Sequence, residues 1–310
     1  MPKTKFGLFF PQTGASFRTI KERAQLADRL GYDSMWFVDH FWSRGLPDLD
    51  HLEAWTLMAS VAAVTERLRI GTLVVCNSYR NPALVAKMTA SLDNISGGRF
   101  GLGIGAGWMD EEYRAYGYPF PSMRARIDQL DEALHVIKRM LTEPRATFQG
   151  RYYSVDEAIN NPKSVQQPHP PILIGGAGEK RMLRLVAEHA DIWNCPNNAA
   201  PQLQHKIEVL HRHCQDVGRN PEEIEVSEQC IVVLGRDAAD LERKLQQARS
   251  TVGKVFDIDT AGLVGAPEQL IDAIEARRQQ GVTFFTMMFG DLNQAETLEL
   301  FAEKVAPAFA

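Results

Sequence analysis

The sequence has few cysteines, and none of them forms a recognisable pair. Its 310 residues contain four, at Cys76, Cys195, Cys214 and Cys230, and no C-x-x-C spacing occurs among them. Isolated thiols of this kind are typical of buried residues in a reducing compartment. We therefore expect buried thiols at these positions rather than disulfides or metal ligands.

A clear set of metal ligands is also missing. His211 and His213 are the nearest approach to a metal pair, in the segment "EVLHRHCQDVG", which is typical of a helix. Residues two apart lie on different faces of a helix, so these two imidazoles are expected at the surface. We therefore expect no metal.

Long apolar segments and basic blocks are absent as well. No uninterrupted apolar run reaches the ~20 residues that span a bilayer, and residues 1–14 lack the apolar region of a secretory signal. The formal charge is −5 and the pI about 5.9, without a dense Lys/Arg block. We expect a cytoplasmic protein with a small-molecule substrate and neither a membrane nor a nucleic acid as partner.

What the sequence does contain is a regular alternation of strands and helices. Predicted strands lie at 5–10, 34–39, 69–75, 99–107, 170–178, 191–195, 223–235 and 282–289. Predicted helices lie at 19–31, 51–66, 81–98, 122–141, 179–190, 201–218, 237–252, 267–280 and 295–305. Eight such units favour an α/β fold of the TIM (β/α)8 barrel type. It would form one domain, 1–310, with insertions near 146–170, including a hairpin at 146–155, and 253–266.

The segment "WFVDHFW" (36–42) places an acid and an imidazole after the second predicted strand. In a barrel, the strands' C-terminal ends carry the active site. Histidine suits proton transfer near neutral pH, so His40 is a candidate acid or base. The alternative is that His40 bonds a backbone carbonyl at the barrel rim. Asp39 could equally be an ordinary loop or N-cap residue.

A glycine-rich turn, "IGGAGEKR" (174–181), follows the fifth predicted strand and precedes a helix. Glycines in such a turn let backbone N–H groups approach a phosphate, whose charge the helix N-terminus favours. Gly175, Gly176 and Gly178 would give that approach, with added charge from Lys180 and Arg181. A tight strand-to-helix turn without a ligand explains the same glycines.

A second glycine-rich segment, "GIGAGWMDEEYRAYG" (103–117), follows the fourth predicted strand. Gly103, Gly105 and Gly107 would thin the wall of the barrel mouth. A flat ring could then lie there with Trp108 and Tyr113 beside it. The alternative is that these glycines only relieve packing.

Taken together and in this order, the strand ends resemble the bacterial luciferase-like monooxygenase superfamily. The resemblance is carried by "VDH", "SGGRFGLGIGAGW", "EEYRAYGYPFP", "NPKSVQQPHPPILIGGAGEKR" and "ADIWN", and it covers nearly the whole chain. The sequence is most similar to the branch of F420-dependent oxidoreductases. The resemblance implies a TIM-like barrel with insertions, usually a homodimer, with a flavin or deazaflavin at the barrel mouth.

The resemblance also implies roles for particular residues. His40 would lie beside the reactive ring, and Asp39 would hold the ring or orient the loop, so these two are the catalytic candidates. A non-prolyl cis peptide is implied between Leu73 and Val74, behind the ring. The implied cofactor-binding residues are Asp39, Leu73, Val74, Trp108, Met109, Gly175, Gly176, Ala177 and Gly178.

Two positions depart from relatives. The F420-dependent sugar-phosphate dehydrogenases carry a glutamate acid near the position of Ala106, where alanine has no proton to donate, so such a substrate is doubtful. Glu111 or Glu112 would be the replacement, although both are expected to be solvated loop carboxylates. Flavin-using relatives often have asparagine where this chain has Met109, which favours deazaflavin.

Three hypotheses follow. In the first, an F420-dependent oxidoreductase transfers hydride between the deazaflavin and an unidentified organic substrate, with water kept out by Trp42, Trp108 and Phe10. In the second, FMN serves a monooxygenase that uses O2 and a partner flavin reductase. In the third, the protein binds flavin or F420 without catalysis.

F420 has an acidic tail, so the first hypothesis also predicts a basic path by which that tail leaves the barrel. The candidate residues are Lys163, Lys180, Arg181 and Arg184.

Overall fold

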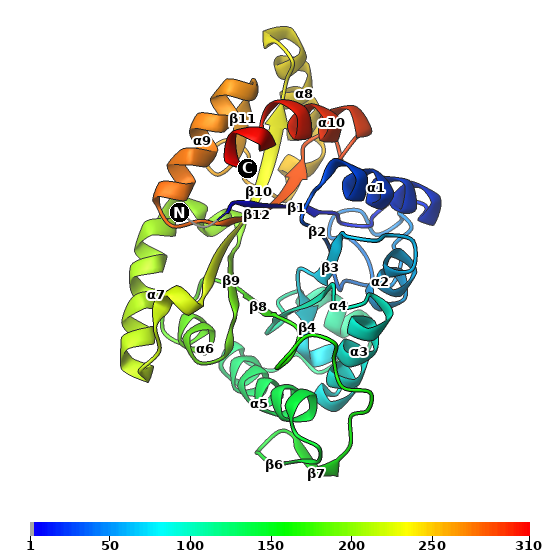
Figure 1. The fold of residues 1–310 in the computed structure, drawn as a ribbon, viewed down its shortest axis with the longest axis vertical. Helices are drawn as coiled ribbons and strands as arrows, with labels where there is room; N and C mark the ends of the chain where they lie inside the picture. The colour runs from blue at the N-terminus through cyan, green and yellow to red at the C-terminus, as the bar shows by residue number, and fades with distance from the viewer. Residues whose placement is uncertain (1–2) are drawn as a thin grey trace.

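Eight parallel strands close into a barrel, as the alternation predicts. The computed structural model describes residues 3–310. Neighbouring strands are hydrogen-bonded in the order β1-β2-β3-β5-β8-β9-β10-β12, and β12 pairs with β1 to close the ring. Figure 1 shows the long helices around the outside of these strands, with the hairpin β6–β7 projecting beyond them. The TIM-barrel prediction is confirmed.

The strands and helices agree with the predicted ones within a few residues at each end. The barrel strands are β1 (Lys5–Phe9), β2 (Ser34–Phe37), β3 (Arg69–Thr72), β5 (Phe100–Gly105), β8 (Ile172–Gly175), β9 (Ile192–Cys195), β10 (Glu225–Leu234) and β12 (Phe284–Phe289). The helices are α1 (Phe17–Leu30), α2 (Ala54–Ala62), α3 (Pro82–Ile95), α4 (Asp110–Ala115), α5 (Met123–Thr142), α6 (Met182–His189), α7 (Leu203–Val217), α8 (Ala238–Ser250), α9 (Pro267–Gln279) and α10 (Ala295–Lys304). Short 3-10 turns are η1 (Asn77–Tyr79), η2 (Asn197–Gln202), η3 (Pro221–Glu223), η4 (Val252–Lys254) and η5 (Ala306–Phe309).

The two expected insertions contain further strands. The hairpin pairs β6 (Ala146–Gln149) with β7 (Ser154–Ala158) in antiparallel fashion. In the second insertion, β11 (Leu263–Gly265) adds to the edge of β10, which the sequence did not indicate. Helix α4 was also not predicted, because six residues are too few to show a clear helical period.

An indole lies in the lower part of the barrel interior. Trp36 lies in β2 and is 4% exposed, and its Nε1 donates to Ser34 Oγ at 2.9 Å. A Cβ on Gly71 would lie 2.4 Å from this ring, and one on Gly101 would lie 3.3 Å from it. The neighbouring strands therefore need glycine because a tryptophan occupies the space between them.

The upper part of the interior is shaped by the chain between β3 and the two-residue strand β4 (Val75–Cys76). The Leu73–Val74 peptide bond is cis, as the resemblance implies. A Cβ would lie 2.8 Å from the Val74 side chain at Gly105, 3.1 Å at Gly175 and 3.3 Å at Gly103. These glycines thus make room for the Val74 side chain in the barrel wall. For Gly103 and Gly105, this supports the alternative that the glycines relieve packing.

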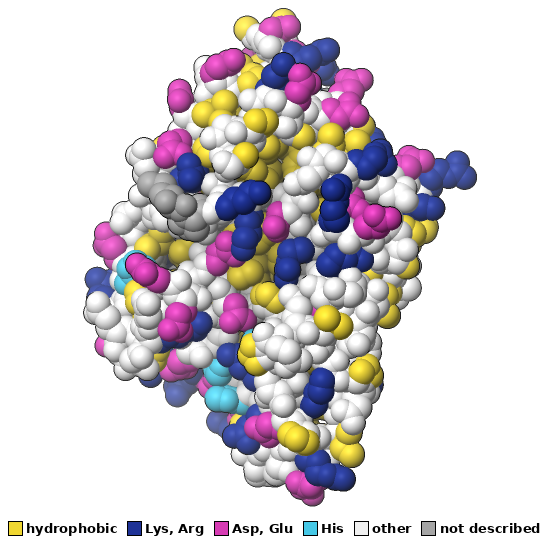
Figure 2. Space-filling view, viewed as in Figure 1, with side chains coloured by type: hydrophobic (Ala, Val, Ile, Leu, Met, Phe, Trp, Pro, Cys, Tyr) yellow, Lys and Arg dark blue, Asp and Glu magenta, His cyan; other side chains and the backbone are white. Residues whose placement is uncertain are grey.

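The surface mixes charges of both signs. On the face drawn in Figure 2, basic and acidic side chains are interspersed, and apolar side chains are visible in the depressions between them. Among residues 3–310, none of the helices has both the length and the apolar character required for a membrane crossing.

Gly103→Ala should destabilise the barrel. A Cβ on Gly103 would lie 1.8 Å from the Thr72 carbonyl oxygen, a backbone atom that cannot move without disturbing β3. We expect a loss of about 1–3 kcal/mol in the free energy of unfolding, measured by urea denaturation. Gly178→Ala is the control, because its Cβ would lie at an ordinary 3.5 Å from Met182. Equal stability of the two variants would contradict the packing argument.

Candidate active site

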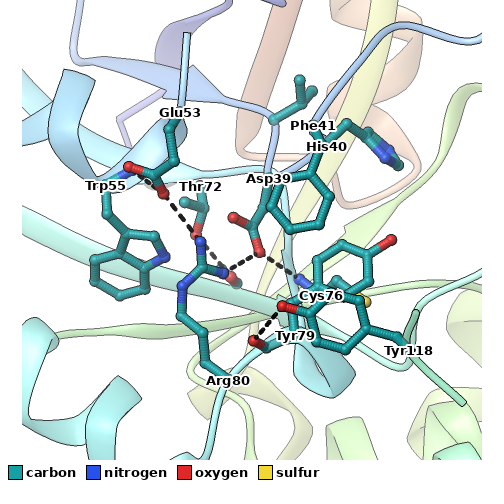
Figure 3. Close-up of polar contacts among 12 residues, drawn as sticks. Asp39, His40, Phe41, Glu53, Trp55, Thr72, Cys76, Tyr79, Arg80 and Tyr118 are labelled. Atoms are coloured by element: carbon teal, nitrogen blue, oxygen red, sulfur yellow. Dashed lines mark hydrogen bonds and ion pairs between the residues drawn. The ribbon is translucent and has the colours of Figure 1, made fainter. Parts of the chain in front are cut away.

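Asp39 and His40 follow β2 directly and therefore lie at the C-terminal end of the barrel. Gln12, after β1, fixes this stretch: its Nε2 donates to the Val38 carbonyl at 2.8 Å, and its Oε1 accepts from the Val38 amide at 3.2 Å. In Figure 3 the two side chains of Asp39 and His40 point in different directions. They consequently have separate sets of partners.

Asp39 belongs to a buried ion-pair network. Its carboxylate accepts from the Cys76 amide at 3.0 Å and from an Arg80 guanidinium nitrogen at 2.8 Å (Figure 3). Arg80 also donates to Glu53 at 2.9 Å and lies over the Trp55 ring. These contacts tie the end of β2 to β4 and to the start of α2, so Asp39 orients the rim of the mouth.

The protonation of Asp39 is balanced close to neutrality. Burial raises the pKa of this carboxyl to about 6, against the lowering effects of the Arg80 charge and the Cys76 amide. The group is therefore ionised at pH 7 and begins to take up a proton just below it.

His40 is held by a carboxylate that the sequence did not identify as buried. The His40 Nδ1 lies 2.8 Å from Glu112 Oε2. Glu112 is 0% exposed and also accepts from the Tyr79 hydroxyl and the Phe41 amide. The expectation of a solvated loop carboxylate is therefore wrong for Glu112, whereas Glu111 is exposed as expected.

These hydrogen bonds keep Glu112 charged. Burial works to raise the pKa of this carboxyl, but the hydrogen bond and charge of His40, with the donors Tyr79 and Phe41, lower it below the usual value. An ionised carboxylate only accepts, so His40 Nδ1 carries the proton in this contact. The other ring nitrogen, Nε2, has no hydrogen-bond partner among residues 3–310.

The outer side of His40 meets an exposed indole. The Trp108 ring lies edge-on to the imidazole, with 5.6 Å between centroids, and half of its surface is exposed. The Arg44 guanidinium, from the loop after β2, lies 5.5 Å above the same indole. His40 and Trp108 are thus brought together at the mouth. Met109, next to Trp108, is instead buried at 3% exposure, at the start of α4.

Two aromatic residues expected at the mouth lie elsewhere. Tyr113 is fully buried, and its hydroxyl lies 3.0 Å from Cys76 Sγ, beneath the rim. Phe10 packs against Phe37 in the layer between strands and helices. Gly107 has φ of +77°, and a Cβ there would overlap the Tyr113 hydroxyl, so this glycine serves packing.

The turn after β8 leaves several backbone donors free. Gly176 has φ of +131°, its amide donates to the Asn194 carbonyl at 3.2 Å, and its own carbonyl accepts from Trp193 Nε1 at 2.7 Å. The following amides, from Ala177 to Lys180, donate to no residue of the described part of the chain. Consecutive unpaired amides before a helix fit an anionic group such as a phosphate.

The expected basic path is only partly formed. Lys163 Nζ contacts the carbonyls of Met140 and Glu143 near the end of α5, away from the β8 turn, so its assignment is wrong. Lys180 is exposed beside the turn. The remaining two cations make ion pairs, Arg181 with Asp128 and Arg184 with Glu188.

Sequence reasoning also overlooked His51. Its Nδ1 lies 3.1 Å from Thr13 Oγ1, and its Nε2 is buried without a partner in the described residues. Burial and the neighbouring His40 lower the pKa of His51 to about 4, so this imidazole is neutral at pH 7.

The sequence does contain one indication that Glu112 is buried. Met109, Glu112 and Tyr113 have the i, i+3, i+4 spacing of a buried helical face.

Comparisons with known proteins agree with this architecture. The family model described as luciferase-like monooxygenase matches residues 4–257. The FMNH(2)-dependent dimethylsulfone monooxygenase of Pseudomonas putida is 25% identical over 319 residues, covering 93% of this chain and 86% of the relative. Both chains are therefore matched over most of their length.

F420-dependent proteins are similar as well. The F420-dependent glucose-6-phosphate dehydrogenase of Kineococcus radiotolerans is 37% identical over 160 residues, about half of each chain at 51% and 47%. A solved F420-dependent secondary alcohol dehydrogenase superposes with a TM-score of 0.83 and 24% identity, covering 100% of both chains. That structure establishes the likeness of fold.

Glu112→Gln should destabilise the mouth in a pH-dependent way. Because the pKa of Glu112 is lowered by folding, its contribution is present above the ordinary pKa of glutamate and disappears as the pH falls through the folded value. We expect a loss of roughly 2–4 kcal/mol in unfolding free energy at pH 7, shrinking in acid. Urea denaturation across pH checks this. The exposed neighbour gives the control, Glu111→Gln, and an equal loss there would refute the role of Glu112.

Asp39→Asn should show the opposite pH dependence. The folded pKa, about 6, is above the ordinary 3.8, so the ionised form is disfavoured by folding. Wild type should lose roughly 2–3 kcal/mol relative to the variant as the pH rises from 4 to 7, which the same denaturation series measures. A stability difference that stays constant over this range would show that burial does not outweigh Arg80.

Proposed function

The chain belongs to the luciferase-like monooxygenase family, and from this premise we propose that it is a coenzyme F420-dependent oxidoreductase. Its reaction would be hydride transfer between the deazaflavin ring and an organic substrate with a hydroxyl or carbonyl group. The coarser conclusion, a flavin- or F420-dependent oxidoreductase, follows from the family itself. The observation that carries the proposal is the imidazole of His40, held by Glu112 at the mouth with Nε2 free.

The residues at the mouth fit a cofactor with a phosphate and a flat ring. The unpaired amides from Ala177 to Lys180, and the glycines Gly175, Gly176 and Gly178, would hold the phosphate. Leu73 and Val74 would support one face of the ring, and Trp108 would border its edge. Asp39 would act by keeping this rim in place, and Met109 by anchoring α4 below it.

The bound cofactor supplies the hydride chemistry. The residues of the chain supply the proton. His40 Nε2, being free, would take a proton from a substrate hydroxyl as hydride leaves the adjoining carbon, or return it to a carbonyl oxygen in the reverse direction. Glu112 keeps Nδ1 protonated and the ring in one orientation, as a carboxylate commonly does for a catalytic imidazole.

F420 is favoured by the charges at the start of α6. Lys180 is exposed, and Arg181 and Arg184 lie within one turn of it, next to the turn proposed to hold the phosphate. The Asp128 and Glu188 partners of the two arginines would then compete with the tail for these cations.

A second candidate is an FMN-dependent monooxygenase. It is favoured by the length of the match to the dimethylsulfone monooxygenase, 93% of this chain, against about half for the glucose-6-phosphate dehydrogenase. In that case reduced flavin would come from a partner reductase, and the apolar rim would protect the reaction with O2 from water.

A parallel titration of the purified protein with F420 and FMN separates the two candidates. We expect F420 to bind more tightly, measured by calorimetry. Arg181→Glu should weaken F420 about fivefold to tenfold and FMN less, because only F420 carries the acidic tail. Arg145→Glu is the control, since Arg145 is an exposed arginine in the segment after α5, paired with Glu157.

Each other outcome has a definite meaning. Tighter binding of FMN would reject F420 and select the monooxygenase. Binding of neither would reject the role of the β8 turn. Equal effects of Arg181→Glu on both cofactors would reject the basic exit path alone.

A further inference from the structure

Two helices on the outside of the barrel bring three metal-binding side chains together. Asp131 and His135 are four residues apart on α5, so they lie on the same face of that helix. His189 is the last residue of α6. Figure 2 shows histidine side chains at the surface over the region where α5 and α6 are seen in Figure 1. The group is separate from His40 and Glu112 at the mouth.

We propose that Asp131, His135 and His189 bind one divalent transition-metal ion, of which Zn2+ is the representative. The ligand atoms of the three side chains all lie within 4.8 Å of one another. Two imidazoles and one carboxylate form a set that suits Zn2+ and neighbouring ions, whereas Mg2+ and Ca2+ prefer oxygen ligands.

The distances are close to those of a loaded site. Asp131 Oδ1 lies 2.9 Å from His189 Nε2 and 3.8 Å from His135 Nε2. A tetrahedral ion about 2.0–2.2 Å from each atom needs ligand atoms roughly 3.3–3.6 Å apart. The third pair, the nitrogens of His135 and His189, lies within 4.8 Å, so movements of less than about 1 Å by each side chain would make room for the ion.

The imidazoles are also oriented before any ion arrives. The His189 side chain is only 6% exposed, and its ring meets that of His135 edge-on with 4.8 Å between centroids. The other side of His135 is stacked on Phe148 of β6, at 5.8 Å and an angle of 15°. Rings fixed in this way lose little entropy on binding an ion.

A structural contact between α5 and α6 explains less of this arrangement than a metal site does. The hydrogen bond between Asp131 and His189 alone would link α5 to α6. It does not account for His135, which presents a second imidazole nitrogen to the same carboxylate oxygen. Asp131 and His135 are half-exposed, at 43% and 48%, so an ion can enter and water can complete its coordination.

His211 and His213, the pair that the sequence singled out, do not form such a group. His213 Nε2 contacts the Glu179 carbonyl at 2.7 Å, and His211 is exposed on α7. The two histidines of the proposed site are 54 positions apart, so only the packing of α5 against α6 reveals them.

The test is calorimetric titration of the full-length, chelator-treated protein with Zn2+, and with Mg2+ for comparison. We expect one Zn2+ per chain at this site and no comparable binding of Mg2+. His135→Ala should weaken Zn2+ at least about tenfold, and His211→Ala should leave the affinity unchanged. Zn2+ should also raise the melting temperature of wild type more than that of His135→Ala, because a ligand of the folded state stabilises it.

The outcomes decide the proposal without a catalytic assay. Unchanged Zn2+ affinity in His135→Ala, or an equal loss in His211→Ala, overturns it, as does the absence of Zn2+ binding by wild type. His189→Gln provides a second ligand variant. If burial makes that variant unstable, the exposed position of His135 still gives a folded protein in which the question is answered.

Discussion

The carboxylate of Glu112 is the contact on which the geometry of the barrel mouth depends. It receives hydrogen bonds from the His40 ring and the Phe41 amide, which belong to the loop after β2, and from Tyr79, which belongs to the segment after β4. Helix α4 carries the carboxylate into this position. A single buried charge thus joins three separate segments, and removing it would leave three donors without an acceptor.

The carboxyl groups of Asp39 and Glu112 show how the surroundings of an acid set its pKa. Asp39 is dominated by burial, which raises its pKa in spite of Arg80. Glu112 is equally buried but accepts more hydrogen bonds, and its pKa is lowered. The first group therefore positions the rim and titrates near neutrality, while the second stays charged and fixes His40. Their opposite pH dependences follow from the opposite directions of the two pKa shifts.

The sequence was sufficient for the barrel because strand and helix periods are repeated many times along it. It also placed Asp39 and His40 at the correct end, since that follows from the order of the strands. It was insufficient for Glu112, because helix α4 has six residues and only Glu112 and Tyr113 of them are buried. The prediction for Lys163 rested on its position in the sequence just before β8. The fold instead places its side chain against the C-terminal end of α5. Asp131 and His189 meet only through helix packing.

The position of the acid has a consequence for the chemistry. The resemblance implies that sugar-phosphate dehydrogenases hold a separate glutamate near the position of Ala106, which here follows β5 directly. Here the carboxylate lies on α4 and is already engaged by His40 and Tyr79, and its low pKa leaves it no proton to donate at pH 7. In the proposed reaction, His40 Nε2 would then be the atom that takes or gives the proton. The proposed exchange between an alcohol and a carbonyl needs one proton per hydride, which this arrangement would supply.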